Sequence, residues 1–269
     1  MMRKYFTVVT LLLFGCTANV KVIQQNKESN VAGLLPVEGK LYASLYQQRS
    51  AEYKALCLQA FNLASVRLNS YTAKTNLPKA IVTDIDETVL DNSPYAVHRA
   101  LQGKEYEPQS WFEWTQKAEA DTVPGAPDFL KYAASRGVEI FYITNREERE
   151  RNSTLINLRK FGLPNTDSTH LLLKSSTSGK EPRRQSVASR YEIMILLGDN
   201  LADFSSLFDK KTPEERNSHV DKVALDFGSR FIIIPNPGYG DWEGAMLKYN
   251  YKWSSAQKDS VYRALLKGY

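Results

Sequence analysis

Residues 80–92 read AIVTDIDETVLDN, a short apolar run that ends in acidic residues. The run over 80–83 is rich in strand formers, and two carboxylates two positions apart follow it, Asp84 and Asp86. Alternation along an extended chain would send both side chains to the same side, with Ile85 pointing away between them. Two acids on one face repel, so the pattern indicates a site where a cation or a proton transfer uses them. The alternative is an ordinary strand end followed by an acidic helix cap.

The composition is that of a globular protein of one large domain, or of one domain with a modest addition. The chain has 269 residues, of which 42% are hydrophobic and 24% are charged. The formal net charge of +5 includes Arg3 and Lys4, so without these two residues the chain carries about +3. This weak basic excess suits a small anionic substrate or an anionic surface, and it argues against nucleic acid as a partner.

The first residues have the pattern of an export signal. Arg3 and Lys4 form a positive start, and residues 5–14 are apolar but too few to span a bilayer as a permanent helix. Cys16 follows directly, which resembles the lipobox of bacterial lipoproteins, where that cysteine is acylated. The pattern predicts a signal peptide over 1–15, lipidation of Cys16, a polar tether over 16–40 and an anchor in the bacterial cell envelope, at the outer membrane. Plain secretion is the alternative.

The rest of the chain alternates between helical and strand patterns. Residues 41–76 carry apolar side chains at three- and four-residue steps, which predicts an amphipathic helix or a pair of helices in which Cys57 is an unpaired, buried thiol. Residues 77–269 form the core, with a helical insertion near 93–122. Expected strands cover 80–83, 138–144, 170–173, 193–197 and 231–234, and expected helices cover 128–136, 146–161 and 181–191. Apolar strands separated by helices predict an α/β fold with a doubly wound parallel sheet.

Polar residues follow each of the first four expected strands. They are Asp84, Asp86, Thr144, Lys180 and Asp199. Because the carboxyl ends of parallel strands meet at one edge of a sheet, these side chains are expected to converge. The set suits phosphoryl transfer through an aspartyl intermediate, with Asp84 as nucleophile, Asp86 as acid and base, Thr144 and Lys180 as phosphate donors, and Asp199 as a ligand of Mg²⁺.

The histidines do not offer a competing zinc site. His98, His170 and His219 are dispersed and lack the spacing of zinc ligands. Two other classes of function stay open on the residues alone. One is a surface lipoprotein that binds a nucleotide or haem without turnover. The other is a phospho-receiver domain, which the export signal and the position of Asp86 do not suit.

The ordered motifs resemble a known family. DIDET, Thr144, Lys180 and GDNLAD look like the haloacid dehalogenase superfamily, and DIDETVLDNSPY, YITNR, GDNLADF and PNPGYGDWEG look like its class C acid phosphatases, the P4-type surface lipoproteins. The resemblance covers about residues 41–247. It implies a Mg²⁺-dependent acid phosphatase that acts on small phosphomonoesters of the nucleotide type, as a possible homodimer.

The same resemblance assigns roles to single residues. It implies that Asp84 is the nucleophile and a metal ligand. It implies that Asp86 is the acid and base and also binds the metal through its backbone carbonyl. Asp199 would be the third protein ligand, and Asp203 a fourth aspartate near the metal. Asn145 accompanies Thr144 in the second motif, and the resemblance implies that Asn145 and Arg183 contact the substrate.

The phosphate-binding lysine has two candidates. Lys180 is preferred over Lys174 because Lys180 and Arg183 repeat the family's Lys-x-x-Arg step, although Pro182 stands inside that step.

Two aromatic residues bear on the substrate class. Trp111 and Tyr239 occupy positions that resemble the aromatics which stack on a nucleobase or nicotinamide. The alternative is that Trp111 packs an inserted helix and Tyr239 fills a turn.

Overall fold

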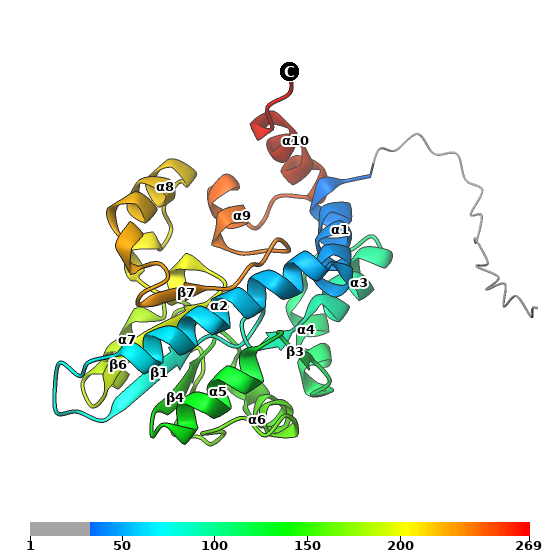
Figure 1. The fold of residues 1–269 in the computed structure, drawn as a ribbon. Coiled ribbons are helices and arrows are strands. Elements are labelled where there is room, and N and C mark those ends of the chain that lie inside the picture. Colours follow the sequence, from blue (N-terminus) through cyan, green and yellow to red (C-terminus); the bar gives the residue numbers. More distant parts are fainter. Residues whose placement is uncertain (1–32) are drawn as a thin grey trace, which may run out of the picture. The chain divides into compact units, whose positions relative to one another are not determined.

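A computed structural model describes residues 33–269. Its centre is a parallel sheet of five strands in the order β5-β4-β1-β6-β7 (Figure 1), which confirms the predicted α/β class. The strands are β1 (Lys79–Thr83), β4 (Glu139–Ile143), β5 (Leu171–Leu172), β6 (Glu192–Gly198) and β7 (Phe231–Ile233). The connection after β1 leads to β4 on one side, and the connection after β6 leads to β7 on the other. The strand order therefore reverses between β1 and β6, and in open α/β sheets ligands bind at the carboxyl ends of the strands where this reversal occurs.

Both faces of the sheet are buried, which explains why its strands are apolar without interruption. In β1, Ile81 belongs to one core cluster, and its neighbours Ala80 and Val82 belong to the other. The helices α2 (Ala51–Ser70) and α5 (Ala126–Ser135) cover the first face, and α6 (Arg151–Lys160) adds Leu155 and Leu158 to the same cluster. On the second face, α7 (Glu181–Ala188) packs against β4 and β6.

The amino-terminal helical segment is a pair of helices. α1 (Leu35–Arg49) and α2 meet at Ser50, whose extended backbone interrupts the helix while its side chain accepts from the N–H of Tyr53. α2 lies along the sheet (Figure 1) and buries a stripe spaced at three and four residues, which consists of Tyr53, Cys57, Phe61, Ala64 and Leu68. Cys57 is a free, buried cysteine, as predicted.

The predicted tether extends too far into the fold. α1 begins at Leu35, so residues 35–40 are helical and the prediction of a tether over 16–40 is wrong at its end. Pro36 suits the first turn of a helix, and Asp259 accepts a hydrogen bond from the N–H of Leu35 at 2.8 Å. The expected signal peptide and Cys16 lie outside the described residues. Among residues 33–269, no helix is both apolar enough and long enough to cross a bilayer.

An insertion separates β1 from β4. It contains α3 (Ser93–Leu101) and α4 (Pro108–Gln116), and a short antiparallel ribbon of β2 (Leu90–Asp91) and β3 (Asp121–Thr122) closes its base. The helical content near 93–122 agrees with the sequence pattern. The ribbon holds the insertion beside the loop that follows β1, because β2 begins only a few residues after that strand ends.

The carboxyl-terminal part contains helices that the sequence pattern did not predict. They are α8 (Pro213–Lys222), α9 (Asp241–Met246) and α10 (Ser255–Leu265), with the short 3-10 turns η2 (Leu201–Asp203), η3 (Ser206–Phe208) and η4 (Ala224–Asp226). The helix expected over 146–161 is present as the 3-10 turn η1 (Glu148–Glu150) followed by α6. α8 buries only Arg216 among its residues, so it lacks the apolar stripe that would have revealed it. The capping box at Thr212 and Glu215 was the available signal.

Candidate active site

The two acids of the opening motif lie in a loop and not on a strand. β1 ends at Thr83, so strand alternation does not place Asp84 and Asp86, and that part of the sequence argument is wrong. The N–H of Asp84 continues the sheet by donating to the carbonyl of Leu197 in β6 at 3.0 Å. Asp86 forms an isolated bridge with Leu90, and Glu87 adopts a left-handed backbone with φ 58°. The two acids therefore lie in an irregular loop, in which neighbouring side chains can have different partners.

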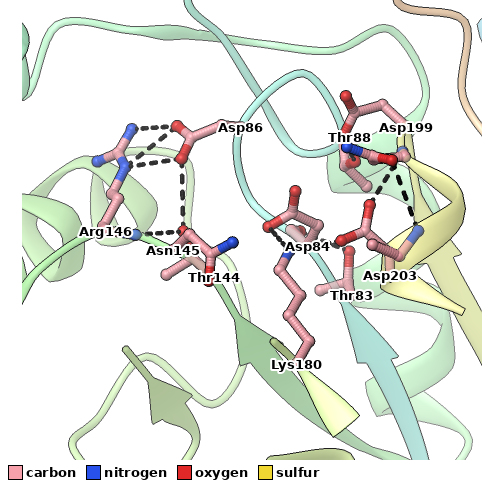
Figure 2. A network of polar contacts seen from close by, with 12 residues as sticks. Thr83, Asp84, Asp86, Thr88, Thr144, Asn145, Arg146, Lys180, Asp199 and Asp203 are labelled. Atoms are coloured by element: carbon pink, nitrogen blue, oxygen red, sulfur yellow. Dashed lines mark hydrogen bonds and ion pairs between the residues drawn. The ribbon is translucent and has the colours of Figure 1, made fainter. Parts of the chain in front are cut away.

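Asp84 belongs to a cluster of three carboxylates around one lysine (Figure 2). Ligand atoms of Asp84, Asp199 and Asp203 all lie within 4.8 Å of one another. The Nζ atom of Lys180 lies 2.6 Å from Oδ1 of Asp84 and 2.6 Å from Oδ1 of Asp203. The predicted convergence of the loops after β1, β5 and β6 is therefore observed.

The carboxylates of this cluster exceed its positive charge. Burial raises the pKa of Asp84 well above its ordinary value, and burial together with the charge of Asp203 raises the pKa of Asp199 to about 8. Burial lowers the pKa of Lys180, but the charges of Asp203 and Asp84 outweigh it and leave the lysine protonated. Three acids with one lysine form an oxygen-rich, negatively charged set, which fits a hard divalent cation such as Mg²⁺.

The position of Asp199 is fixed from two sides. Its Oδ1 accepts from the hydroxyl of Thr88 at 3.1 Å, and its Oδ2 accepts from the amide of Asn236 at 2.8 Å. Gly198, directly before it, leaves room for Asp203, because a Cβ at Gly198 would come within 2.4 Å of Cβ of Asp203. Only glycine permits this close approach of η2 to the end of β6.

Asp86 has a different set of partners. Nη2 and Nε of Arg146 donate to its Oδ1 at 2.7 and 3.1 Å, and the amide of Asn92 donates to the same oxygen at 2.8 Å. Its Oδ2 has longer contacts, from Nε of Arg146 at 3.3 Å and the hydroxyl of Thr144 at 3.4 Å. Figure 2 shows the side chain turned toward Arg146, whereas Asp84 faces Lys180.

Sequence reasoning missed the role of Arg146. The residue was visible in the motif YITNR, directly after Thr144 and Asn145, but an arginine at the start of a charged stretch gave no reason to expect burial. Its side chain is only 1% exposed, and it also donates to the hydroxyl of Thr154 at 3.1 Å. The buried arginine therefore acts as the fixed counter-charge of Asp86.

Arg183, predicted to bind substrate, contacts the loop after β4. It donates to the carbonyl of Thr144 at 2.5 Å and to the side chain of Asn145 at 2.8 Å. Thr144 is fully buried, and its hydroxyl accepts from the N–H of Arg146 at 3.1 Å. Within the described structure Arg183 thus supports the loop that presents Thr144.

The two candidate lysines lie in different places. Lys180 is buried beside Asp84, as described above. Lys174 pairs with Glu147 at 3.1 Å, and both side chains of that pair are partly exposed. The contact with Asp84 therefore favours Lys180 as the phosphate-binding lysine.

The two predicted aromatic contacts come from different elements. Trp111, on α4, packs edge to face against Tyr95 at 5.1 Å between ring centres, and the guanidinium of Arg146 lies 5.8 Å from its ring. Tyr239, in the loop after β7, is 36% exposed, and its hydroxyl donates to Glu87. Burial, together with the charge of Asp86, raises the pKa of Glu87 to about 8. Trp111 is half-buried and Tyr239 is exposed, so neither ring is enclosed in the hydrophobic core.

Comparisons with known proteins agree on a family. The family described as "HAD superfamily, subfamily IIIB (Acid phosphatase)" matches residues 6–242. The solved class C acid phosphatase from Bacillus anthracis is 43% identical, with a TM-score of 0.84 over 87% of this chain and 99% of that chain. A second structure of that enzyme, with tungstate bound, has a TM-score of 0.83 and the same identity.

More distant relatives come from plants. Vegetative storage protein 2 of Arabidopsis thaliana is 25% identical over 219 residues, which is 76% of this chain and 72% of that protein. The stem 31 kDa glycoprotein of Glycine max is 25% identical over 163 residues, 58% of this chain and 62% of that protein, so the match spans less than two thirds of its length. The family match and the Bacillus structure carry the conclusion: this chain belongs to subfamily IIIB of the HAD superfamily, the acid phosphatases, and has the fold of a class C enzyme.

Proposed function

We propose that this acid phosphatase is a Mg²⁺-dependent phosphomonoesterase that acts through a covalent aspartyl phosphate on Asp84. The observation that carries the proposal is the unlike environment of two acids in one loop. Asp84 contacts Lys180 at 2.6 Å in a carboxylate-rich cluster, whereas Asp86 pairs with the buried Arg146 at 2.7 Å. A nucleophile and a proton-transferring group need different surroundings, and these two acids have them.

The reaction has two halves. In the first, a carboxylate oxygen of Asp84 attacks the phosphorus atom, the ester P–O bond breaks, and the leaving alkoxide takes a proton from Asp86. In the second, Asp86 removes a proton from a water molecule as that water attacks the phosphorus of the acyl phosphate. The bond between Asp84 and phosphorus then breaks, which releases inorganic phosphate. Lys180 and the buried hydroxyl of Thr144 donate to the phosphoryl oxygens in both halves.

The metal would lie within the carboxylate cluster. Asp84, Asp199 and the backbone carbonyl of Asp86 would hold Mg²⁺, with Asp203 beside them. When bound, the ion neutralises negative charge shared by the phosphoryl group and the carboxylates. Burial, together with the charge of Asp203, raises the pKa of Asp199 to about 8, and a bound cation would relieve the part that comes from charge.

The substrate class is a small phosphomonoester of the nucleotide type. Trp111 and Tyr239 support this choice, because aromatic side chains that are not confined to the core can stack on a base. Such stacking contributes on the order of 1 kcal/mol per contact. A preference of this size biases the enzyme toward nucleoside monophosphates and still permits other esters.

The proposal also covers the lipid anchor at Cys16 and the oligomeric state. The positive start, the short apolar segment and Cys16 support a lipoprotein in the bacterial cell envelope, at the outer membrane. Changing Cys16→Ser should release the protein into the soluble fraction after export.

The resemblance to P4-type enzymes motivates a homodimer, and sedimentation of the purified protein at several concentrations tests it.

One substrate panel with and without Mg²⁺ tests the chemistry. We expect hydrolysis of aryl phosphates and nucleoside monophosphates at mildly acidic pH with Mg²⁺, and its loss with a chelator. Asp84→Asn should lower turnover about 10³-fold or more, whereas Asp221→Asn, an exposed control on α8, should leave it unchanged. If Asp84→Asn keeps more than a tenth of the activity, Asp84 is not the nucleophile. Tight nucleotide binding without turnover would instead identify a binding lipoprotein.

A further inference from the structure

A buried asparagine lies between the acid Asp86 and the helical insertion. Asn92 is 2% exposed and occupies the last position of the opening motif, directly before α3. Its side-chain amide donates to Oδ1 of Asp86 at 2.8 Å, and its carbonyl oxygen accepts from the indole N–H of Trp114 on α4 at 2.8 Å. Its backbone N–H donates to Glu87 at 2.9 Å. One side chain thus joins the catalytic loop to the insertion.

An amide matches the chemistry of the two partners at this position. An indole N–H can only donate a hydrogen bond, and an ionised carboxylate can only accept one. The residue between Trp114 and Asp86 must therefore accept on one side and donate on the other. Aspartate would place a second negative charge against Asp86, and alanine would leave the half-buried indole N–H without its acceptor.

The same contacts distinguish the two oxygens of Asp86. Oδ1 receives three short donors, two from Arg146 and one from Asn92, at 2.7 to 3.1 Å. Oδ2 receives only the longer contacts, at 3.3 and 3.4 Å, from Arg146 and Thr144. An oxygen that is surrounded by N–H donors is a poor place for a proton, so Oδ2 is the oxygen that can carry it.

We propose that Asn92 is a positioning residue for proton transfer by Asp86. It occupies Oδ1 so that the proton moves at Oδ2, and it fixes the direction of that oxygen relative to α4, which also carries Trp111. Trp111 and Trp114 lie on one short helix, so Asn92 links the position of Oδ2 to that of Trp111. A leaving group that packs on Trp111 would then lie at a fixed position relative to the proton donor. This inference rests on the proposed function, because it assumes that Asp86 protonates the leaving group.

The test compares leaving groups that need a proton with leaving groups that do not. A series from alkyl phosphates through phenyl phosphate to dinitrophenyl phosphate covers this range, and kcat/KM reports the step that breaks the ester bond. Asn92→Ala should lower kcat/KM about tenfold more for an alkyl phosphate than for dinitrophenyl phosphate, as expected for one lost hydrogen bond to a charged group. Trp114→Phe, which removes the N–H and keeps a ring, should shift the series in the same direction by about threefold.

A second buried asparagine provides the matched control. Asn157 on α6 is also 2% exposed and binds the backbone of Ala120 at the end of the insertion, at 2.9 and 3.1 Å. Asn157→Ala should lower the melting temperature and affect all leaving groups equally. If Asn92→Ala and Trp114→Phe also affect all leaving groups equally, Asn92 is merely structural and the inference is wrong.

Asp86→Asn separates this inference from the proposed function. It should impair alkyl phosphates about 10²-fold more than dinitrophenyl phosphate. If that dependence is present and Asn92→Ala shows none, only the role of Asn92 fails. If Asp86→Asn itself shows no dependence on the leaving group, the assignment of Asp86 as the acid fails, and the inference fails with it.

Discussion

The two acids of the loop after β1, Asp84 and Asp86, lie in different charge environments. On the side of β6, Asp84 lies with Asp199 and Asp203 around a single lysine, so negative charge exceeds positive charge. On the side of the insertion, Asp86 pairs with a buried arginine whose side chain is 1% exposed. The first arrangement leaves negative charge in excess, whereas in the second the carboxylate of Asp86 has a buried counter-charge supplied by the protein.

This difference shows how two acids only two positions apart acquire separate roles. Asp84 lies where a cation and Lys180 can accompany a phosphoryl group. Asp86 receives its short hydrogen bonds at Oδ1, from Arg146 and Asn92, and only longer contacts at Oδ2.

The largest expected effect compares the two lysines that follow β5. Lys180→Ala should lower kcat/KM about 10³-fold, because it removes the buried counter-charge 2.6 Å from Asp84. Lys174→Ala should change it less than about twofold, since an exposed ion pair such as that with Glu147 contributes little. Steady-state assays on a nucleoside monophosphate measure both. Equal losses would contradict the placement of Lys180 on the nucleophile's side.

The counter-charge of Asp86 gives the next effect. Arg146→Met should lower the free energy of unfolding by about 3 kcal/mol, because it leaves a carboxylate without its cation. Arg149→Met removes an exposed pair with Glu147 and should cost less than about 1 kcal/mol. Urea unfolding measures both changes. Adding Asp86→Asn to Arg146→Met should restore at least half of the loss; additive losses would show that Arg146 does not act through Asp86.

A smaller effect concerns how the stability of the metal-free protein depends on pH, because buried carboxylates bind protons in the folded state. The pKa of Asp199 and that of Glu87 are each raised to about 8, from 3.8 and 4.5. Between pH 5 and 8 the folded, metal-free protein therefore holds protons that the unfolded chain has released, so stability falls as pH rises. We expect a loss on the order of 2 kcal/mol per pH unit in urea unfolding.

Added Mg²⁺ provides the control for this pH dependence. The ion should reduce the loss by binding ionised carboxylates, and binding at pH 7 should release protons, which calorimetry in buffers of different ionisation enthalpy detects. Stability that rises from pH 5 to 8 without metal would contradict the charge excess on the side of Asp84.

The smallest effect concerns the aromatic residue whose hydroxyl binds Glu87. Tyr239→Ala should raise KM for a nucleoside monophosphate about fivefold, which corresponds to one stacking contact, and should leave KM for a small alkyl phosphate nearly unchanged. Tyr251→Ala, at a residue that is 64% exposed, serves as the control. An equal rise for both substrates would assign Tyr239 to packing and not to recognition of the base.

The fold and the main candidate residues followed from local sequence patterns. Apolar runs such as IMILL identified the strands because both faces of the sheet are buried, and polar residues directly after them marked one edge. Asp84, Lys180, Asp199 and Asp203 meet there, as the topology required. Local patterns also misplaced the start of the first helix and gave strand alternation as the reason for the two acids, because element ends depend on capping contacts.

The tertiary structure alone decided which donor meets which acid. Arg146 reaches Asp86 across 60 positions, and Tyr239 reaches Glu87 across 152. Asn92 lies near Asp86 in sequence, but its second partner Trp114 is 22 positions away on the inserted helix. The periodicity of a sequence fixes which face of an element is buried. It carries no information on the path of an insertion, and that path places Trp114 and Asn92 beside Asp86, away from the carboxylate cluster around Asp84.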